Sequence, residues 1–354
     1  MAFALLLPAG MTRTQQTALA AGAVALGAAL LSRGLRTARR MDFAGRIVVI
    51  TGGSRGLGLL IARQLVAEGA HVTIAARDQA ELDRAYGELT ARGAKVHAVA
   101  CDVGNREEAE RLIHDTLEHH GRIDLLINNA GVMKVGPIEH MEHADFEEAM
   151  AVHFWGPLHT TLAAVPAMKR QGGGRTVNIS SIGGKIGVPH LTPYCASKFA
   201  LTGLSDSLRG ELAKDNIFVT TVCPGMMRTG SPFNAWFKGN HRDEFTWFTI
   251  SDSIPVASID GRRAAWQVID AARHGDPELV ITLPAKFAVI ANAVAPEIVA
   301  SIMAAANTMV LPPPADGAGA DARSGWQSLS DWAPSRLTRL TERAANENNE
   351  VPPA

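Results

Sequence analysis

Tyr194 and Lys198, in the stretch "TPYCASKFALTG" (192–203), have the spacing of two side chains that share one face of a helix. A helix returns to the same face after about 3.6 residues, so the two side chains would lie one above the other. A phenol beside an ammonium group can transfer a proton, because the positive charge favours the phenolate. The same spacing also occurs on ordinary helices, so the rest of the chain must decide between the two interpretations.

The elements that would position this pair alternate from Gly45 onward. Short apolar runs rich in β-branched residues alternate with stretches whose apolar residues have helical spacing. This order predicts an α/β fold, in which a doubly wound parallel sheet of six or seven strands carries helices on both faces. The predicted strands are 46–50, 71–76, 95–101, 123–128, 175–180 and 217–223, with a candidate seventh at 278–282. The predicted helices are 59–69, 79–91, 105–119, 144–169 and the one that contains Tyr194.

The segment "TGGSRGLG" (51–58) lies directly between the first predicted strand and the first predicted helix. Its glycines permit a tight turn and let a ligand approach the backbone, while the helix that follows directs free N–H groups and its positive dipole end at that ligand. A diphosphate fits such a turn. The predicted cofactor-binding residues here are Gly52, Ser54, Arg55, Gly56, Leu57 and Gly58.

The end of the second predicted strand indicates which dinucleotide is bound. An acidic residue that would bind a ribose 2′-hydroxyl is expected about 20 residues past the turn, but the chain has Ala76 and Arg77 there. A guanidinium can pair with a 2′-phosphate, so Arg77, with Arg55 in the turn, favours NADP(H) over NAD(H). The neighbouring Asp78 argues in the other direction, and Arg77 as a solvated surface residue is the alternative.

Composition excludes several classes of protein. The 354 residues are 47% hydrophobic and 19% charged, as in a globular protein, and the net charge of −1 gives no indication of a nucleic-acid partner. The three cysteines, Cys101, Cys195 and Cys223, are too few for a disulfide framework or a metal cluster, so we expect reduced core thiols and no metal site.

Four motifs together resemble the short-chain dehydrogenase/reductase family, outside its extended branch. They are "TGGSRGLG", "NNAG" (128–131), "SS" (180–181) and "YCASK" (194–198), in the family's order and spacing over residues 43–230. The resemblance implies a Rossmann-type sheet and hydride transfer between a nicotinamide and a carbonyl or alcohol. It implies that Tyr194 is the acid/base, that Lys198 tunes it and binds the nicotinamide ribose, and that Ser181, rather than Ser180, hydrogen-bonds the substrate oxygen.

The resemblance also assigns further cofactor contacts. It places Asp102 and Val103 at the adenine, Asn128, Ala130 and Gly131 in the loop at the sheet end, and 224–229 at the nicotinamide amide, with Pro224, Gly225 and Thr229 as contacts. Asn128 could equally stabilise its loop. Many family members have an asparagine in the helix after "NNAG", where this chain has His153, which could replace it, leave a rerouted water chain or only pack.

Residues 1–42 form an apolar segment with a basic flank. Between Arg13 and Arg33, 19 residues carry no charge, and a helix over them would be about 28 Å long, against a hydrocarbon core of about 30 Å. A membrane anchor over 14–32, a secretory signal and an amphipathic surface helix are all compatible with this pattern. The charges that follow the apolar run argue against a signal and would keep the next domain in the cytoplasm.

The predicted Rossmann domain spans 43–283 and includes a substrate lid at 226–260, where five aromatic residues lie between 236 and 248. These rings favour an apolar, lipid-, steroid- or aromatic-like substrate, but they could equally fill a core or an oligomer contact. The apolar segment 284–310 is expected to be helical and to lie on a membrane, over the active site or in a homo-oligomer. The composition of 311–354 predicts a largely disordered tail, with one short helix near 335–345.

The sequence thus predicts an NADP(H)-dependent oxidoreductase that interconverts a carbonyl and an alcohol. A non-catalytic NADP(H)-binding sensor on the same fold is the alternative, but such a protein would need the glycine turn without Ser181, Tyr194 and Lys198. Extended-branch epimerases and dehydratases also use Tyr-x-x-x-Lys, but the three-residue gap in the glycine turn and the lack of a long C-terminal substrate domain argue against them.

Overall fold

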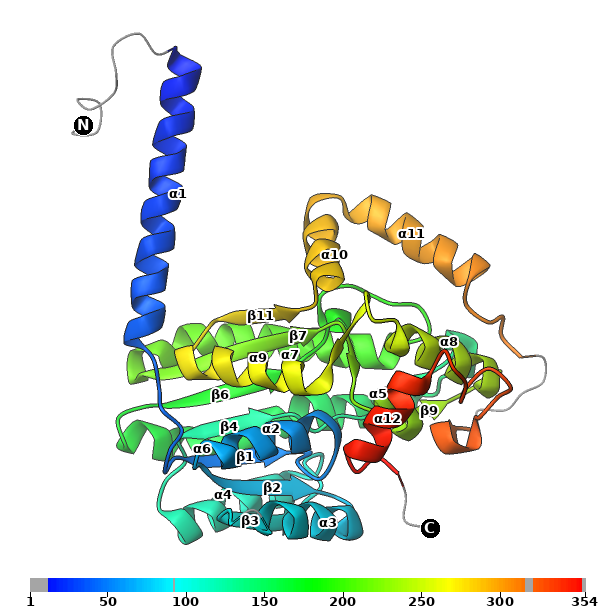
Figure 1. The fold of residues 1–354 in the computed structure, drawn as a ribbon, viewed down its shortest axis with the longest axis horizontal. Coiled ribbons are helices and arrows are strands. Elements are labelled where there is room, and N and C mark those ends of the chain that lie inside the picture. The colour runs from blue at the N-terminus through cyan, green and yellow to red at the C-terminus, as the bar shows by residue number, and fades with distance from the viewer. Residues whose placement is uncertain (1–11, 92, 316–320, 352–354) are drawn as a thin grey trace.

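A seven-stranded parallel sheet forms the centre of the molecule in the computed structural model, which describes residues 12–91, 93–315 and 321–351 (Figure 1). Its strands lie in the order β11-β7-β6-β4-β1-β2-β3. Their bounds are β1 Ile47–Thr51, β2 His71–Ala76, β3 Val96–Ala100, β4 Leu125–Asn128, β6 Gly174–Ile179, β7 Ile217–Pro224 and β11 Glu278–Ile281. This confirms the doubly wound prediction and its seventh strand. The chain order reverses between β1 and β4, and at such a switch point ligands bind beyond the carboxyl ends of the strands.

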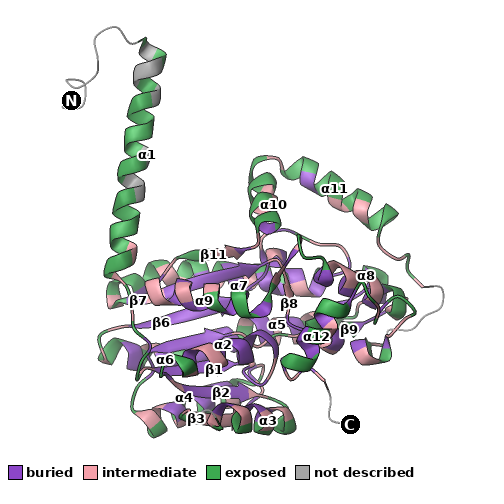
Figure 2. Cartoon of the chain, in the orientation of Figure 1, coloured by how far each residue is buried: buried purple, intermediate pink, exposed green. Residues whose placement is uncertain are grey.

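Helices cover both faces of the sheet, as predicted. One face carries α2 (Gly56–Ala67), α3 (Gln79–Thr90) and α9 (Gly261–His274), whose leucine, isoleucine and alanine side chains share one apolar core with β1, β2 and β4. The other face carries α4 (Arg106–His120), α6 (Gly156–Arg170) and α7 (Thr192–Leu212) over a second core. The central strands β1, β4 and β6 are buried along their whole length, whereas the edge strands β3 and β11 are partly exposed (Figure 2).

Local capping explains several helix boundaries. The Asp78 carboxylate accepts the Glu81 backbone N–H at 2.8 Å and starts α3, so this residue has a capping function. Asn105 caps α4 in the same way, and Gly121 ends that helix in the left-handed conformation, with φ of 74°. The predicted helix 144–169 is divided into α5 (His143–Met150), a π-helical turn (Ala151–Trp155) and α6.

The predicted lid contains small elements arranged over the carboxyl end of the sheet. They are β8 (Met226–Arg228), β9 (Trp236–Phe237), α8 (His241–Ser253) and β10 (Ser258–Asp260), with β9 paired to β5 (Lys134–Val135). Phe237 and Phe245 are fully buried in a third apolar cluster, whereas Trp236 is 42% exposed. Some of the lid aromatics therefore fill a small core.

The expectation of a largely disordered tail is wrong for residues 321–351. This part of the chain contains β12 (Arg323–Ser324), which pairs with β9, and α12 (Arg339–Glu347), which packs against α8. Trp326, Leu329 and Val351 join the apolar cluster of the lid. Composition could not reveal this order, because the contacts come from segments that are remote in sequence.

Two apolar structures project from the body on the side of β11 (Figure 1). One is α1 (Arg13–Ala38), and the other is a pair of helices, α10 (Leu283–Val294) and α11 (Pro296–Met309), as expected for 284–310. Arg36 fixes the base of α1 through ion pairs to Asp270 at 2.5 Å and Asp276 at 2.8 Å. Of the helices in the described part of the chain, none has both the length and the apolarity required to span a bilayer.

Candidate active site

The predicted site residues gather at the carboxyl ends of β1, β4, β6 and β7. The glycine turn follows β1, Asn128 ends β4, Ser181 lies two residues past the end of β6, and Pro224 ends β7. Tyr194 and Lys198 enter from α7, which begins at Thr192 with Pro193 in its first turn, a favoured position for proline. Parallel strands therefore bring together residues that lie more than 170 positions apart in the sequence.

Ser181, Tyr194 and Lys198 form one cluster. The Ser181 hydroxyl hydrogen-bonds the Tyr194 phenol, and its oxygen also accepts the Gly183 backbone N–H at 3.0 Å. The Lys198 Nζ lies 5.6 Å from the centre of the Tyr194 ring and donates to the Ile179 carbonyl at 2.8 Å. Lys198 is only 4% exposed, and Tyr194 is partly buried. The spacing read from the sequence thus corresponds to a real contact.

The pKa values of Tyr194 and Lys198 differ from the simple expectation that the lysine lowers the pKa of the phenol. Burial raises the pKa of Tyr194 to about 12, and the hydrogen bond from Ser181 opposes this only in part. Burial also lowers the pKa of Lys198 to about 7, because a low-dielectric site disfavours the ammonium form. In the protein alone Tyr194 is therefore a neutral phenol, suited to donate a proton rather than to accept one.

Ser180 and Ser181 have different partners. The Ser180 hydroxyl donates to the Lys198 backbone carbonyl at 3.0 Å and pairs with the Thr202 hydroxyl at 2.8 Å, so it ties β6 to α7. A Cβ on Gly184 would lie 2.4 Å from this hydroxyl, which leaves no room for a ligand there. Ser181 is the serine that faces Tyr194, as the resemblance implied.

The backbone of the glycine turn lies so close to neighbouring atoms that two of its positions accommodate only glycine. A Cβ on Gly58 would lie 2.0 Å from the Gly52 carbonyl oxygen, and one on Gly52 would lie 2.8 Å from Ala130 Cα. Gly52 also has φ of 64°, in the left-handed region. The N-cap residue Arg55 gives α2 no side-chain cap, and the positive dipole end of this helix faces the turn. The first N–H of the helix, at Gly56, donates to the Asn348 carbonyl at 2.9 Å. This geometry fits the diphosphate of a dinucleotide.

Asn129, the second residue of the "NNAG" motif, holds this turn, although it was not predicted as a site residue. Its Nδ2 donates to the Thr51 and Gly52 carbonyls at 3.1 and 3.0 Å. Asn128 lies beside it but faces the sheet, where it donates to Asn178 Oδ1 at 2.9 Å and accepts from the Thr160 hydroxyl at 2.7 Å. The buried Asn128 side chain therefore stabilises its loop, the second of the two roles considered for it.

Glu81 is a second residue that the sequence analysis missed. Its carboxylate pairs with Arg55 Nη1 at 2.6 Å and accepts from the buried Ser54 hydroxyl at 3.1 Å. Arg55 is thus engaged by an acid that lies outside the turn motif. Arg77 is exposed just beyond β2 and forms no hydrogen bond or ion pair with any residue that the structure describes.

The remaining predicted cofactor residues lie near the carboxyl ends of the strands or in the loops that follow them. Val103 is buried, and the Asp102 carboxylate accepts the Gly104 N–H at 2.9 Å while its own N–H donates to Glu108. A Cβ on Gly131 would lie 3.2 Å from His153 Nε2, and one on Gly225 would lie 2.6 Å from the Thr282 hydroxyl. Ala130 N–H donates to Thr51 Oγ1 at 3.1 Å, and Thr229 is 3% exposed.

His153 is fully buried in the π-helical turn and contacts Tyr194 edge-on, with 5.4 Å between the ring centres. Its Nε2 accepts the Val132 backbone N–H at 3.1 Å, so the proton is on Nδ1, which donates to the Ser197 hydroxyl at 2.8 Å. Burial, and then the charge of Lys198, hold the pKa of His153 well below its ordinary value. Both ring nitrogens are therefore hydrogen-bonded within the protein, an arrangement that favours packing among the three roles considered for this residue.

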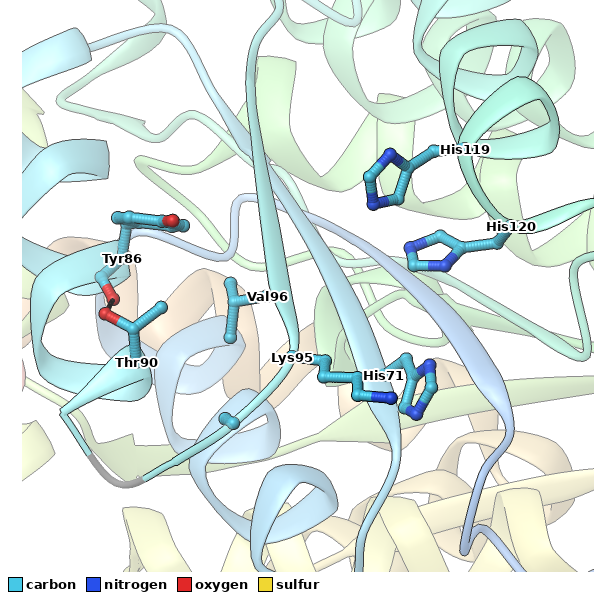
Figure 3. Close-up of a pocket in the computed structure, with 8 residues that line it drawn as sticks. His71, Tyr86, Thr90, Lys95, Val96, His119 and His120 are labelled. Carbon is cyan, nitrogen blue, oxygen red and sulfur yellow. Dashed lines mark hydrogen bonds between the residues drawn. The ribbon is translucent and has the colours of Figure 1, made fainter.

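A small pocket lies next to Tyr194. A pocket lined by Val132, Lys134, Pro193 and Tyr194, among others, measures about 10 Å³, roughly the room of one water. A larger cavity of about 440 Å³ lies by β3, lined by His71, Tyr86, Thr90, Lys95, Val96, His119 and His120 (Figure 3). It contains none of the three clustered residues, so the chemistry is not located there.

Comparison with known proteins agrees with this arrangement. A family model described as "short chain dehydrogenase" matches residues 46–235. The chain is 36% identical over 207 residues to Dehydrogenase/reductase SDR family member 4 from Rattus norvegicus, which is 58% of this chain and 74% of that protein. It is 38% identical over 185 residues to an uncharacterized oxidoreductase from Thermotoga maritima, which is 52% of this chain and 73% of that protein.

A solved structure has the same fold. A short-chain dehydrogenase from Streptomyces avermitilis superimposes with a TM-score of 0.63 and 27% identity, covering 76% of this chain and all of that one. The family model alone matches more than half of the chain. Together with the parallel sheet and the glycine turn, these matches show that the chain belongs to the short-chain dehydrogenase/reductase family of NAD(P)-binding oxidoreductases.

Proposed function

We propose that this oxidoreductase interconverts a carbonyl and an alcohol on an apolar substrate, using NADP(H) in preference to NAD(H). The observation that carries the proposal is the cluster of Ser181, Tyr194 and Lys198 beside the glycine turn. A non-catalytic sensor would need the turn alone. The hydrogen bond between Ser181 and Tyr194 instead supports a site that handles a proton.

Each side chain has one role in this proposal. A bound nicotinamide supplies or accepts the hydride. In the reducing direction the Tyr194 hydroxyl, which is protonated in the protein alone, donates its proton to the carbonyl oxygen of the substrate. The Ser181 hydroxyl hydrogen-bonds the same oxygen as negative charge develops on it. Lys198 would hold the nicotinamide ribose.

The proposed cofactor preference rests on Arg77. Its guanidinium is exposed at the end of β2, where a 2′-phosphate can accept paired hydrogen bonds from it. Asp78 does not oppose this preference, because its carboxylate caps α3. Arg55 contributes less than expected, since Glu81 already engages it.

The apolar cluster of the lid supports an apolar substrate. Tyr194 packs at its margin, together with Met133 and Val188, while Phe233 and Phe248 lie deeper in the cluster. A wall of this composition favours lipid-, steroid- or aromatic-like carbonyl compounds, because transfer of apolar surface from water is the main source of their affinity.

The test follows NADPH absorbance with a panel of carbonyl compounds. We expect turnover with apolar aldehydes or ketones and, in Tyr194→Phe, a loss of about 10²-fold or more, the usual contribution of general acid catalysis. The affinity for NADPH should stay within about twofold, because the phenol oxygen is not part of the glycine turn. Tyr86→Phe is the matched control, since Tyr86 and Tyr194 are the two tyrosines of the chain. Full activity of Tyr194→Phe would refute the proposed role.

We also propose that the apolar projections on the side of β11 associate with a membrane. Leucine, phenylalanine and isoleucine side chains on α1, α10 and α11 are between 46% and 70% exposed, among them Leu31, Leu35, Phe287, Ile290 and Ile298. Such a concentration of exposed apolar side chains is unusual for a protein surface that faces only water. Self-association into a homo-oligomer is the competing use of the same surface.

A further inference from the structure

Residues Asn348–Glu350, which follow α12 and are here called the strap, return to the glycine turn at the start of α2. The Asn348 carbonyl accepts the Gly56 backbone N–H at 2.9 Å. The Asn349 Nδ2 donates to the Ser54 and Glu81 carbonyls at 2.9 and 3.1 Å. Two segments almost 300 positions apart in the sequence therefore share a continuous set of hydrogen bonds.

The Glu350 carboxylate lies against the turn itself. A Cβ built on Gly56 would be 2.5 Å from Glu350 Oε1, so the carboxylate fills the space that this glycine leaves open. Its Oε2 lies 3.4 Å from Arg55 Nε and accepts from Asn234 Nδ2 at 2.6 Å. The same amide donates to the Glu350 backbone carbonyl at 2.8 Å. Glu350 is only 5% exposed, which makes this a buried contact.

These contacts involve the groups that an anionic ligand of the turn requires. A diphosphate at a helix N-terminus accepts backbone N–H groups of the first turn, and the strap has taken the N–H of Gly56. A diphosphate cannot share this position with the Glu350 side chain, because that side chain already fills the space beside Gly56. A carboxylate and a diphosphate are therefore alternative occupants of the turn.

We propose that the strap is an internal competitor of the cofactor, which must displace Asn348–Glu350 in order to bind. This inference rests on the proposed cofactor site and adds a segment of the chain that regulates access to that site. The strap is held from the far side by α12, whose Thr341 hydroxyl pairs with the Ser253 hydroxyl at 2.6 Å and with Asp252 at 3.1 Å on α8. The Asn348 Nδ2 also donates to the Thr229 carbonyl at 3.2 Å.

The consequence is a weaker apparent affinity for the cofactor. When only a fraction of molecules has the binding-competent arrangement, the apparent Kd equals the intrinsic Kd divided by that fraction. A strap that is docked in nine of ten molecules would weaken binding about tenfold. Because α12 packs on the lid helix α8, release of the strap also loosens the cover over the cluster around Tyr194.

The test compares NADPH affinity, measured by calorimetry, in the full chain and two variants. Asn234→Ala removes both hydrogen bonds to Glu350 and leaves the glycine turn and its charges unchanged. Glu350→Ala removes the carboxylate. We expect both to tighten binding by about fivefold or more, as the docked fraction falls. Glu347→Ala is the matched control, since this acid faces Arg343 and Arg262 instead of the turn, and it should leave the affinity unchanged.

Hydrogen exchange provides a readout that does not depend on activity. NADPH should increase exchange at the amides of 345–351 in the full chain, and Asn234→Ala should show the same increase without NADPH. Equal affinity in all four proteins, or protection of 345–351 by NADPH, would overturn the inference and leave the oxidoreductase function intact. Failure of every variant to bind NADPH or NADH would instead contradict the proposed function itself.

Discussion

At the scale of single residues, the proposed preference for NADP(H) is tested most directly at Arg77. Arg77→Gln should lower kcat/KM for NADPH by about tenfold or more, since charge-assisted hydrogen bonds contribute about 1.5–3 kcal/mol each, and should leave kcat/KM for NADH nearly unchanged. Initial rates with both cofactors measure this. Arg170→Gln, a change at an exposed arginine at the end of α6, is the control. An equal loss with the two cofactors would show that Arg77 does not read the 2′-phosphate.

The buried Lys198 makes stability depend on pH. Its pKa is about 7 in the folded protein, against 10.5 for an ordinary solvated lysine, so between these values the unfolded chain binds more protons than the folded one. Stability from this group therefore rises with pH across that window, by at most about 1.4 kcal/mol per unit. Below pH 7 both states are protonated and the slope disappears.

Urea unfolding of the cofactor-free protein at a series of pH values tests whether stability rises with pH as expected. The free energy of unfolding of the wild type, minus that of Lys198→Met, should increase from pH 7 toward pH 10. The exposed Lys214→Met should show no such trend when it is compared in the same way. A flat difference for Lys198→Met would mean that its ammonium is not destabilised by burial.

At the scale of elements, most of the sheet could be predicted because strands and helices of a doubly wound fold have strong local patterns. The second strand, predicted at 71–76, has these bounds in the structure, and the glycine turn lies where its motif required. Asn129, Glu81 and Glu350 could not be predicted. Each acts on the turn through contacts made only in the folded chain. Asn129 lies in the "NNAG" motif, but the motif does not reveal that its amide binds the glycine turn, and Glu81 and Glu350 belong to no motif of fixed spacing.

The π-helical turn within the predicted helix 144–169 also could not be predicted from the local sequence pattern. It places His153 where both ring nitrogens find partners on Val132 and Ser197. His153→Asn has a shorter side chain that cannot reach both, so at least one buried group loses its hydrogen bond. We expect a loss of about 1–3 kcal/mol in the free energy of unfolding, measured with urea.

The pH dependence of the rate should not change in this variant. Because the pKa of His153 lies well below its ordinary value, the imidazole stays neutral across the working range. The profile of kcat/KM for His153→Asn should therefore keep the shape of the wild-type profile, even where its height falls. His159→Asn, further along the same helical segment and partly exposed, should affect neither quantity. An ionisation near pH 6–7 that disappears only in His153→Asn would assign the imidazole a role in proton transfer.

At the scale of the whole molecule, α1 and the α10–α11 pair leave the body on the same side, as Figure 1 shows. Phe287 and Ile290 on α10 are 70% and 60% exposed, and Arg33 and Arg40 near the base of α1 are exposed cations. On α1 itself, the exposed Leu31 and Leu35 are close in sequence to Arg33. Exposed apolar side chains with basic ones nearby are typical of surfaces that bind anionic lipids, and each apolar side chain that is fully buried there contributes about 1.5–3 kcal/mol.

The full chain should therefore float with vesicles that contain anionic lipid, and added salt should weaken but not abolish this association. Phe287→Asp combined with Ile290→Asp should reduce the bound fraction severalfold, because charges on α10 then face the acyl region. Val256→Asp changes an apolar residue in the loop after α8 that is 85% exposed, more than either α10 residue, and it should have no effect. If the wild type stays unbound, and only its oligomeric state responds to the α10 substitutions in light scattering, the projections join copies of the chain rather than lipid.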